Sequence, residues 1–417
     1  MNATTQSVAD LASRWLGGTV MAASDESFGD KENLLSPARP AFEPGRYGNR
    51  GEIVDGWETR RRREPGHDWA LVRLGAPGRI SSVVVDTSFF TGNYPEQCAV
   101  EACGREGYPS PGELNDPAAD WAEIVPRSDL RGDALNTFAV SDPRRFTHVR
   151  LSAFPDGGVA RLRVLGQVVP DPRGLERLTI DLASQEHGGL VVASSDDFYT
   201  AAQTLNRPDR ARTMGDGWET RRRRDGGHDF VIFRLGFAGR VMRMIIDTAH
   251  FRYNASAAAA VYGCTHAGTP PASAQNPRPA ADPPEWHEIL GRTRLQPDTR
   301  HVFDVPGVGQ PVAAIRLDAY PDGGLSRVRV IGRIDAAARR SAGYRWFNSL
   351  PAGQALDCLK AAGVPPDAAS DLAGHRPVSP GWLADLRARA PSGDDGPAAH
   401  VRALATMLEG EPERPGT

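Results

Sequence analysis

Hydrophobic positions occur in short segments through most of the chain. Within residues 69–74, 80–86 and 147–154, apolar side chains alternate with polar ones or run together, and β-branched residues are prominent. Short segments of this kind, with Gly or Pro at their ends, are typical of strands. The sequence before residue 340 has no long amphipathic helical pattern. The pattern therefore predicts an all-β fold for this part of the chain.

The pattern changes after Ser341. The segments WFNSLPAGQALDCLKAAG and HVRALATMLEG place Leu and Ala three and four residues apart, which is the spacing of one helix face. We expect residues 341–417 to form a small helical appendage. Its last stretch, 409–417, reads EGEPERPGT, and this polar composition predicts disorder.

The sequence also repeats itself over a long period. The segment DGWETRRRR occurs at residues 55–63 and again at 216–224, a shift of 161 residues. Further along, RLSAFPDGGVARLRVLG begins at Arg150 and RLDAYPDGGLSRVRVIG at Arg316, so the loops between the two motifs absorb five residues. A repeat of this length is a whole domain rather than a unit that must stack on its neighbours to fold.

We therefore expect two tandem homologous domains, at residues 8–168 and 172–336, with the Pro-rich segment 168–174 as their linker. The 44 glycines and 34 prolines supply enough turn formers for many short strands. Each domain is predicted to be an antiparallel β-sandwich of the jelly-roll type.

Composition narrows the class of protein further. The chain has 417 residues, of which 40% are hydrophobic and 24% charged, and its formal net charge is −3. These values are typical of a globular protein and exclude a collagen or a coiled coil. A broad nucleic-acid surface would need a basic excess. No apolar run reaches the ~18 residues that span a membrane and no leader pattern stands at the start, so we expect a cytoplasmic protein without nucleic-acid or membrane partners. The cysteines lack CxxC spacing and are expected to be buried thiols.

The repeated motif is a dense polar cluster directly before a strand. Asp55, Trp57, Glu58 and four arginines are followed by His67 and Asp68. A guanidinium binds a carboxylate through two parallel hydrogen bonds, so this cluster suits a small anion that also presents N–H groups. Phosphate and nucleic acid fit less well, because acids interrupt the arginines and no phosphate-loop glycine pattern is present. The motif tryptophans either close the end of the sandwich or contact the substrate.

Histidines follow the motif in both copies, at His67 and His228. An imidazole titrates near neutrality, so these residues are candidates for a general acid or base, or for hydrogen bonding to the substrate. A surface or capping role is the alternative. A divalent metal held by His67, Asp68 and Glu58, or by His228, Asp229 and Glu219, is another interpretation, although adjacent His and Asp residues on a strand point apart. We assign no metal ligand, and the cofactor requirement is left open.

A loop with an asparagine follows the next predicted strand, at Asn93 in the first copy and Asn254 in the second. An amide donates and accepts hydrogen bonds at once, which fits a urea-like group, and a plain turn former is the alternative. Tyr253 replaces Gly92 of the first loop. Because glycine permits close approach of the backbone to a ligand, we expect the first copy to hold the more complete site. One site built from both copies is the other possibility.

The doubled segments DGWETRRRR and GHD, the segment VDTSFFTGNYPEQC and the doubled PDGG segment resemble the allantoicase family over about residues 8–336. The resemblance implies two galactose-binding-like jelly rolls in one subunit, and an enzyme of purine (allantoin) degradation that hydrolyses allantoate to ureidoglycolate and urea. It also implies a homo-oligomer. It carries over no metal ligand. A non-catalytic tandem carbohydrate-binding protein is the main alternative, and an interaction scaffold is a third.

Allantoate carries one carboxylate and two ureido groups, so its site needs a cation, partners for urea N–H groups, and an acid and a base. We predict a catalytic set of Glu58, His67 and Asp68. The predicted substrate-binding set is Asp55, Trp57, Arg60, Arg61, Asn93, Asp216, Glu219, Arg221, His228 and Asn254.

The helical tail has a resemblance of its own. The segments FNSLPAGQALDCLKAAG and AGHRPV are similar to the opening helices of the decarboxylase that acts on the oxo-hydroxy-carboxy-ureidoimidazoline intermediate of urate breakdown. The tail is far shorter than that enzyme and lacks its His-Pro catalytic segment. We expect an inactive remnant or an oligomer contact.

Overall fold

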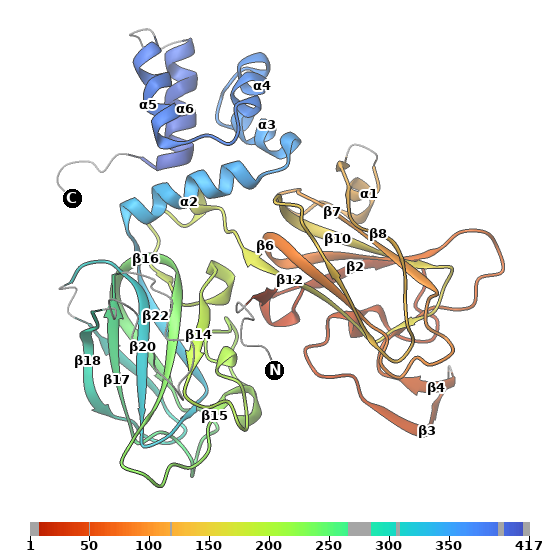
Figure 1. Cartoon of the computed structure of the whole chain (residues 1–417), viewed down its shortest axis with the longest axis horizontal. Helices are drawn as coiled ribbons and strands as arrows, with labels where there is room; N and C mark the ends of the chain where they lie inside the picture. Colours follow the sequence, from red (N-terminus) through yellow and green to blue (C-terminus); the bar gives the residue numbers. More distant parts are fainter. Residues whose placement is uncertain are drawn as a thin grey trace. The chain divides into compact units, whose positions relative to one another are not determined.

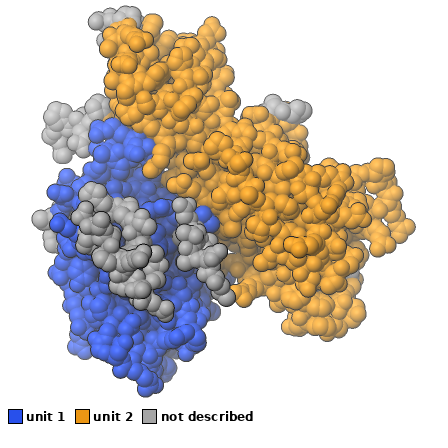
Figure 2. All heavy atoms as spheres, in the orientation of Figure 1, with its two compact units in different colours: residues 1–8, 171–343 blue, residues 9–170, 344–417 orange. Residues whose placement is uncertain are grey.

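The computed structural model describes residues 8–49, 51–116, 119–265, 285–305, 309–390 and 396–411. Two compact units are distinguished by colour in Figure 2. One contains residues 9–170 together with 344–417, and the other is built on residues 171–343. Each unit is described by itself.

The first repeat is an antiparallel β-sandwich (Figure 1). The main strand order is β1-β12-β6-β10-β7-β8, and β2 and β9 also pair with β6. These strands are β1 (Ala9–Asp10), β2 (Thr19–Ala23), β6 (Asp68–Asp86), β7 (Gln97–Cys103), β8 (Ala122–Asp129), β9 (Leu135–Ala139), β10 (Arg145–Phe154) and β12 (Arg161–Val168). Two small ribbons accompany them: β5 (Trp57–Glu58) with β11 (Gly158–Val159), and β3 (Phe42–Gly48) with β4 (Gly51–Val54).

Strand β6 differs from the sequence prediction, because residues 69–74 and 80–86 belong to one strand of 19 residues. Its first half pairs with β2 and β10 and its second half with β9 and β12. The turn formers between the halves do not end the strand. A Cβ on Gly78 would lie 2.3 Å from the carbonyl oxygen of Gln167, so this glycine permits a close approach of two chains.

The second repeat has the same order of strands, β13-β22-β16-β20-β17-β18, with β14 and β19 also on β16. The strands are β13 (Ile180–Asp181), β14 (Leu190–Ser194), β16 (Asp229–Asp247), β17 (Ala258–Cys264), β18 (His287–Arg294), β19 (Arg300–Asp304), β20 (Val312–Tyr320) and β22 (Arg327–Ile334). The short strands β15 (Trp218–Glu219) and β21 (Gly324–Leu325) pair as β5 and β11 do. These observations confirm the predicted all-β fold of two tandem jelly rolls.

One element distinguishes the repeats. The shift between the copies is 171 residues at Asp10 and Asp181 but 161 at Asp55 and Asp216, so the first repeat has ten additional residues before its motif. The hairpin β3–β4 lies in this longer segment. In the second repeat, the described residues before the motif form the 3₁₀ turns Ala202–Thr204 and Met214–Asp216.

The tail forms five helices, α2 (Ala336–Ser349), α3 (Ala352–Ala361), α4 (Pro366–Gly374), α5 (Pro380–Arg389) and α6 (Pro397–Glu409). The helical prediction is confirmed, although the first helix begins at Ala336 rather than after Ser341. Side chains such as Trp346, Leu359 and Leu404 form a buried core of its own. Residues 412–417, which include most of the stretch predicted to be disordered, lie outside the described residues.

The tail contacts the first repeat within their common unit. Gln354 Nε2 donates a hydrogen bond to Glu106 Oε1 at 2.7 Å, and the same oxygen accepts from the buried Arg145. Val169 packs against the tail core. The tail is therefore part of the packing of this unit.

We predict that deletion after Arg340 leaves kcat/KM within about twofold, because the candidate site described below lies in the repeats. The deletion exposes Val169 and removes the hydrogen bond to Glu106. A loss on the order of 1–2 kcal/mol would lower the unfolding temperature by roughly 2–8 °C. Calorimetry and turnover measurements on the truncated and full chains test this, with Gln354→Ala in the full chain as the matched variant. Loss of turnover in a folded truncation would contradict the prediction.

The cysteines and the possibility of a membrane-spanning helix were also considered in the sequence predictions. All four cysteines are free and buried, as predicted. Among the described residues, no helix has the length and apolar character needed to cross a membrane.

Candidate functional site

The motif tryptophan closes the end of each sandwich. Trp57 lies in β5 with none of its surface exposed, and its indole Nε1 donates to the carbonyl oxygen of Asp25 at 2.8 Å. Trp218 is equally buried and donates to the carbonyl of Asp196. The only polar atom of each indole is therefore occupied. Both side chains support the site from within and do not face solvent.

The neighbouring glutamate meets the asparagine of the distant loop. Asn93 Nδ2 donates to Glu58 Oε1 at 2.7 Å, and Asn254 Nδ2 donates to Glu219 Oε1 at 2.6 Å. The two residues of each pair are 35 positions apart in the sequence. Both repeats thus bring together a carboxyl and an amide that sequence reasoning had chosen separately.

Glu58 has an unusual electrostatic environment. Its partial burial raises the pKa of the carboxyl above its ordinary value, and the hydrogen bond from Asn93 only partly opposes this effect. No neighbouring charge contributes to the shift. A carboxyl with a raised pKa keeps its proton to higher pH, which suits a general acid.

The four arginines of the first motif have different environments. The backbone N–H of Arg60 donates to Asp25 Oδ1 at 2.8 Å, and its Nε lies 3.5 Å from Oδ2. Arg62 is paired with Asp68 at 2.9 Å. Arg61 and Arg63 are exposed, and within the described ranges neither has a hydrogen-bond or ion-pair partner. Arg221 of the second repeat lies near Asp196, as Arg60 lies near Asp25.

Asp25 was not predicted as a site residue, and its side chain is mostly buried. Burial by itself would raise the pKa of Asp25, but hydrogen bonds from the backbone N–H groups of Arg60 and Ser27 lower it. The signal was in the sequence, because ASDES at 23–27 and ASSDD at 193–197 occupy equivalent places before the two motifs. Asp25 and Asp196 fix the chain where the arginines begin.

Asp55 and Asp216 lie at the start of the motif and are tied to its surroundings. Asp55 forms an ion pair with the buried Arg161 at 2.6 Å and accepts from the backbone N–H of Ala41 at 3.1 Å. Asp216 accepts from the backbone N–H of Arg212 at 2.9 Å. Each carboxylate holds the preceding segment against the motif.

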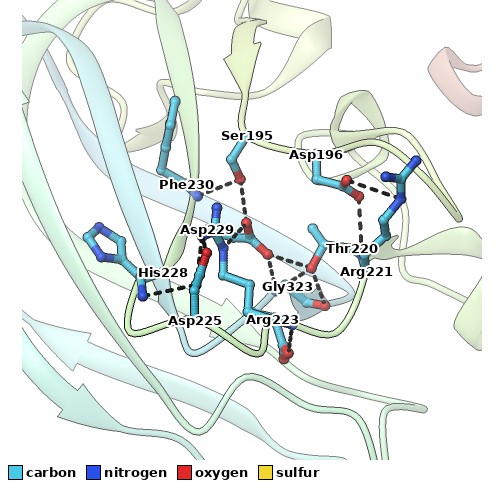
Figure 3. Close-up of polar contacts among 12 residues, drawn as sticks. Ser195, Asp196, Thr220, Arg221, Arg223, Asp225, His228, Asp229, Phe230 and Gly323 are labelled. Carbon is cyan, nitrogen blue, oxygen red and sulfur yellow. Dashed lines mark hydrogen bonds and ion pairs between the residues drawn. The ribbon is translucent and has the colours of Figure 1, made fainter. Parts of the chain in front are cut away.

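Asp68 and Asp229 are the buried centres of a polar network. Asp229 is 1% exposed and accepts hydrogen bonds from Ser195, Thr220 and Arg223 (Figure 3). Asp68 accepts from Ser24 and Arg62, both at 2.9 Å. These carboxylates are directed into the protein, where they fix the motif loop on the first residue of the long strand.

Each histidine after the motif packs on an aromatic ring. The ring of His67 lies 4.6 Å from that of Phe154, and burial and the positive charges of Arg62 and Arg150 lower the pKa of His67. His228 packs in the same way on Tyr320, and its Nε2 lies 3.1 Å from Asp318 Oδ2 without hydrogen-bond geometry. Figure 3 shows His228 pointing away from Asp196 and Arg221.

The asparagine loop has a backbone feature that sequence reasoning missed. Phe89 and His250 occupy equivalent places and both have a left-handed backbone, with φ of 68° and 70°. Their N–H groups donate to Asp133 Oδ1 at 2.8 Å and to Asp298 Oδ1 at 2.7 Å. Non-glycine residues in this region are uncommon and concentrate at functional sites. An Asp-Thr pair precedes the loop in both copies, and this repeated pair indicates the loop but not its left-handed conformation.

The protein surroundings of Gly92 do not require a glycine. A Cβ at this position would meet nothing within 4 Å, and its φ is not in the left-handed region. Tyr253 at the equivalent place is 98% exposed, and the bond from Asn254 to Glu219 is formed nonetheless. The prediction that the first copy holds the more complete site stays a prediction.

No cluster of three His, Cys, Asp or Glu side chains suited to a metal ion occurs in the described part of the chain. Glu58, His67 and Asp68 have separate partners, namely Asn93, Phe154 and Arg62. We assign no metal ligand among them.

Comparisons with known proteins agree with this geometry. The family model described as "Allantoicase repeat" matches residues 9–169 and 180–335. A probable allantoicase of Nocardia farcinica is 48% identical over 326 residues, covering 78% of this chain and 94% of the relative. One from Streptomyces coelicolor is 45% identical over 350 residues, covering 81% and 89%. The crystal structure of allantoicase from Saccharomyces cerevisiae matches with a TM-score of 0.66 at 32% identity, covering 79% of this chain and 95% of that one.

Proposed function

This chain belongs to the allantoicase family, and we propose that it hydrolyses allantoate to ureidoglycolate and urea at the glutamate–asparagine pair of each repeat. The observation that carries the location of the site is the pairing of Glu58 with Asn93 and of Glu219 with Asn254. Both repeats have kept this contact although the surrounding loops differ.

The reaction replaces one C–N bond of the substrate by a C–O bond. Water supplies the oxygen, and the departing urea nitrogen must receive a proton as the C–N bond breaks. The carboxyl of Glu58 is the proton donor in this proposal, because its raised pKa keeps it protonated to higher pH. Asn93 holds one carboxyl oxygen through a hydrogen bond of 2.7 Å, which leaves the other oxygen to carry the proton.

The substrate carboxylate needs a cation. Of the two arginines predicted to bind substrate in the first repeat, Arg61 is the better candidate, since the described structure shows no partner for its guanidinium, whereas Arg60 lies near Asp25. Arg62 is paired with Asp68. Asp55, Asp216 and Arg221 contribute by holding the surrounding segments in place.

We predict that Arg61→Lys raises KM on the order of tenfold, because lysine keeps the charge but not the two parallel donors. Arg60→Lys is the matched control and should change KM by less than about threefold, since the Arg60 backbone contact to Asp25 is retained. Steady-state kinetics with allantoate tests the pair. Equal effects of the two changes would argue against a clamp at Arg61.

The other predicted residues act indirectly in this proposal. Trp57 and Asp68 are buried and position Asp25 and Arg62. His67 and His228 pack on aromatic rings, and we propose that they stabilise the loop after the motif.

The decisive experiment is urea release from allantoate by the purified chain, measured with added divalent metal and with a chelator. Release of urea supports the proposal, and no release under either condition rejects it. The carbohydrate-binding alternative is disfavoured, because the solved structures that match at 32% and 33% identity are allantoicases. A role in allantoin degradation, a cytoplasmic location, a homo-oligomer and the absence of nucleic-acid and membrane partners stay predictions.

A further inference from the structure

We propose that His250 is a proton-transfer residue of the second site, a role that Phe89 cannot fill at the same place in the first. This inference rests on the proposed allantoate hydrolysis. His250 is not among the site residues predicted from the sequence.

Three hydrogen bonds place His250 beside the glutamate–asparagine pair. His250 Nε2 lies 3.0 Å from the carbonyl oxygen of Ala211, and the next backbone N–H, of Arg212, donates to Asp216 at 2.9 Å. Asn254 then bonds to Glu219 at 2.6 Å. Asp216 is three residues from Glu219, and His250 is four residues from Asn254. These contacts and the short chain segments between them link His250 to the glutamate–asparagine pair in a closed ring, and in this proposal the imidazole lies at the rim of the site.

The contact with Ala211 determines which ring nitrogen is available. A carbonyl oxygen only accepts hydrogen bonds, so Nε2 must carry the hydrogen in this contact. In the neutral imidazole the lone pair then lies on Nδ1. The His250 side chain belongs to an exposed residue, and Nδ1 has no partner in the described ranges. This nitrogen can accept a proton from water.

The backbone fixes the position of the ring. His250 has a φ of 70°, and its N–H is held by Asp298 Oδ1 at 2.7 Å. A left-handed backbone at a non-glycine residue costs free energy, on the order of 1–3 kcal/mol, and persists where the surroundings enforce it. The same conformation at Phe89, held by Asp133, shows that it belongs to the loop rather than to the histidine.

The first repeat has the same ring of contacts with one difference. Ala41 donates to Asp55 and Asn93 donates to Glu58, as their counterparts do. At the third contact, however, the ring of Phe89 lies 5.8 Å from that of Phe42, at the start of the additional hairpin. An apolar contact there replaces the histidine–carbonyl contact. The two repeats therefore differ in proton-transfer chemistry at this point.

The charged groups near His250 come from its own loop, from the turn before β19 and from the facing segment 211–216. Asp298 accepts from the His250 backbone and forms an ion pair with Arg252 at 3.3 Å. On the facing segment, Ala211 offers only a carbonyl, Arg212 turns to Asp216, and Met214 Sδ lies 3.2 Å from Asn254 Nδ2.

The proposed step forms one C–O bond, breaks one C–N bond and conserves the protons. A proton of water moves to Nδ1 of His250, and the water oxygen forms a bond to the central carbon of allantoate. The C–N bond breaks with its electron pair remaining on the urea nitrogen, which takes a proton from the carboxyl of Glu219. Solvent then returns a proton to Glu219 and removes one from His250, which leaves ureidoglycolate and urea.

The experiment isolates the second site by using Glu58→Gln protein, in which turnover above that of the Glu58→Gln, Glu219→Gln double variant comes from the second repeat. Adding His250→Phe should lower this remaining kcat/KM about 10²-fold or more and abolish the loss of activity on the acidic side of its pH profile. Phenylalanine is chosen because Phe89 shows that it fits this backbone. The matched control is His287→Phe, at an exposed residue that starts β18, which should have no effect.

Each outcome decides a separate point. An unchanged pH profile and less than a threefold loss in His250→Phe protein overturn the assignment. The absence of any second-site turnover in Glu58→Gln protein also overturns it, while allantoate hydrolysis by the first site stands. Urea release that is lacking already in the unaltered chain would reject the proposed function itself.

Discussion

Replacing Glu58 and Glu219 together by glutamine is expected to lower kcat/KM for allantoate about 10²–10⁴-fold, the range that a general acid or base contributes. Glutamine has the same shape and can still accept the hydrogen bond from Asn93 or Asn254. It cannot supply a proton to the departing nitrogen. Each single variant should retain the turnover of the other repeat.

The pH dependence follows from the raised pKa of Glu58. A general acid works while it is protonated, so first-site activity should be present below this pKa and decline as the pH rises through it. In Glu58→Gln protein the first site no longer contributes, so the alkaline decline that depends on the pKa of Glu58 should be absent from the remaining turnover.

Steady-state kinetics between pH 5 and pH 9, the range over which most proteins keep their fold, tests this prediction. Glu64→Gln is the matched control, because Glu64 is an exposed carboxylate directly after the first motif. A double variant with more than about a tenth of the original kcat/KM would show that neither carboxyl is the proton donor.

Trp57→Ala is expected to lower the free energy of unfolding of the first repeat by about 3–5 kcal/mol, as for other fully buried aromatic side chains. Trp57 has no exposed surface, and the hydrogen bond from its indole to Asp25 would be lost as well. The cavity would lie directly below Glu58 and the start of the arginine run. Trp57→Phe fills most of the volume and should cost considerably less.

Chemical denaturation followed by circular dichroism measures the change, and Trp218→Ala offers the equivalent cavity in the second repeat. A similar loss there would support a common supporting role. A loss below about 1 kcal/mol for Trp57→Ala, together with a raised KM, would instead show that the tryptophan contacts the substrate.

Local patterns in the sequence were sufficient for the classes of structure. Alternation of apolar and polar residues is a property of neighbouring positions, and it predicted the strands at 69–74, 80–86 and 147–154 and the helical character of the tail. The continuity of β6 could not be predicted this way. Whether Gly75, Pro77 and Gly78 end a strand depends on the chains that pack beside them, such as the one carrying Gln167.

The candidate site, too, could be predicted only in part from the sequence. The repeat by itself indicated that DGWETRRRR and the asparagine loops are important, because identical residues recur in otherwise diverged copies. It selected Glu58 and Asn93 separately, and the structure shows that the two side chains are in contact. Only the tertiary structure decided the partners of each side chain. Asp25, Phe89 and His250 reach the site through contacts between residues 35 to 44 positions apart, which no local pattern encodes.

The sequence by itself thus determined the fold class, the repeat and the family of this protein, since these depend on residue types and their spacing along the chain. The tertiary structure decided which charges are buried, which motif arginines have a partner and where the two repeats differ. Those properties depend on distances between segments that fold together from far apart. The sequence shows that His250 stands in the second copy where Phe89 stands in the first. Only the tertiary structure shows that Phe89 contacts another aromatic ring there, whereas His250 contacts a backbone carbonyl.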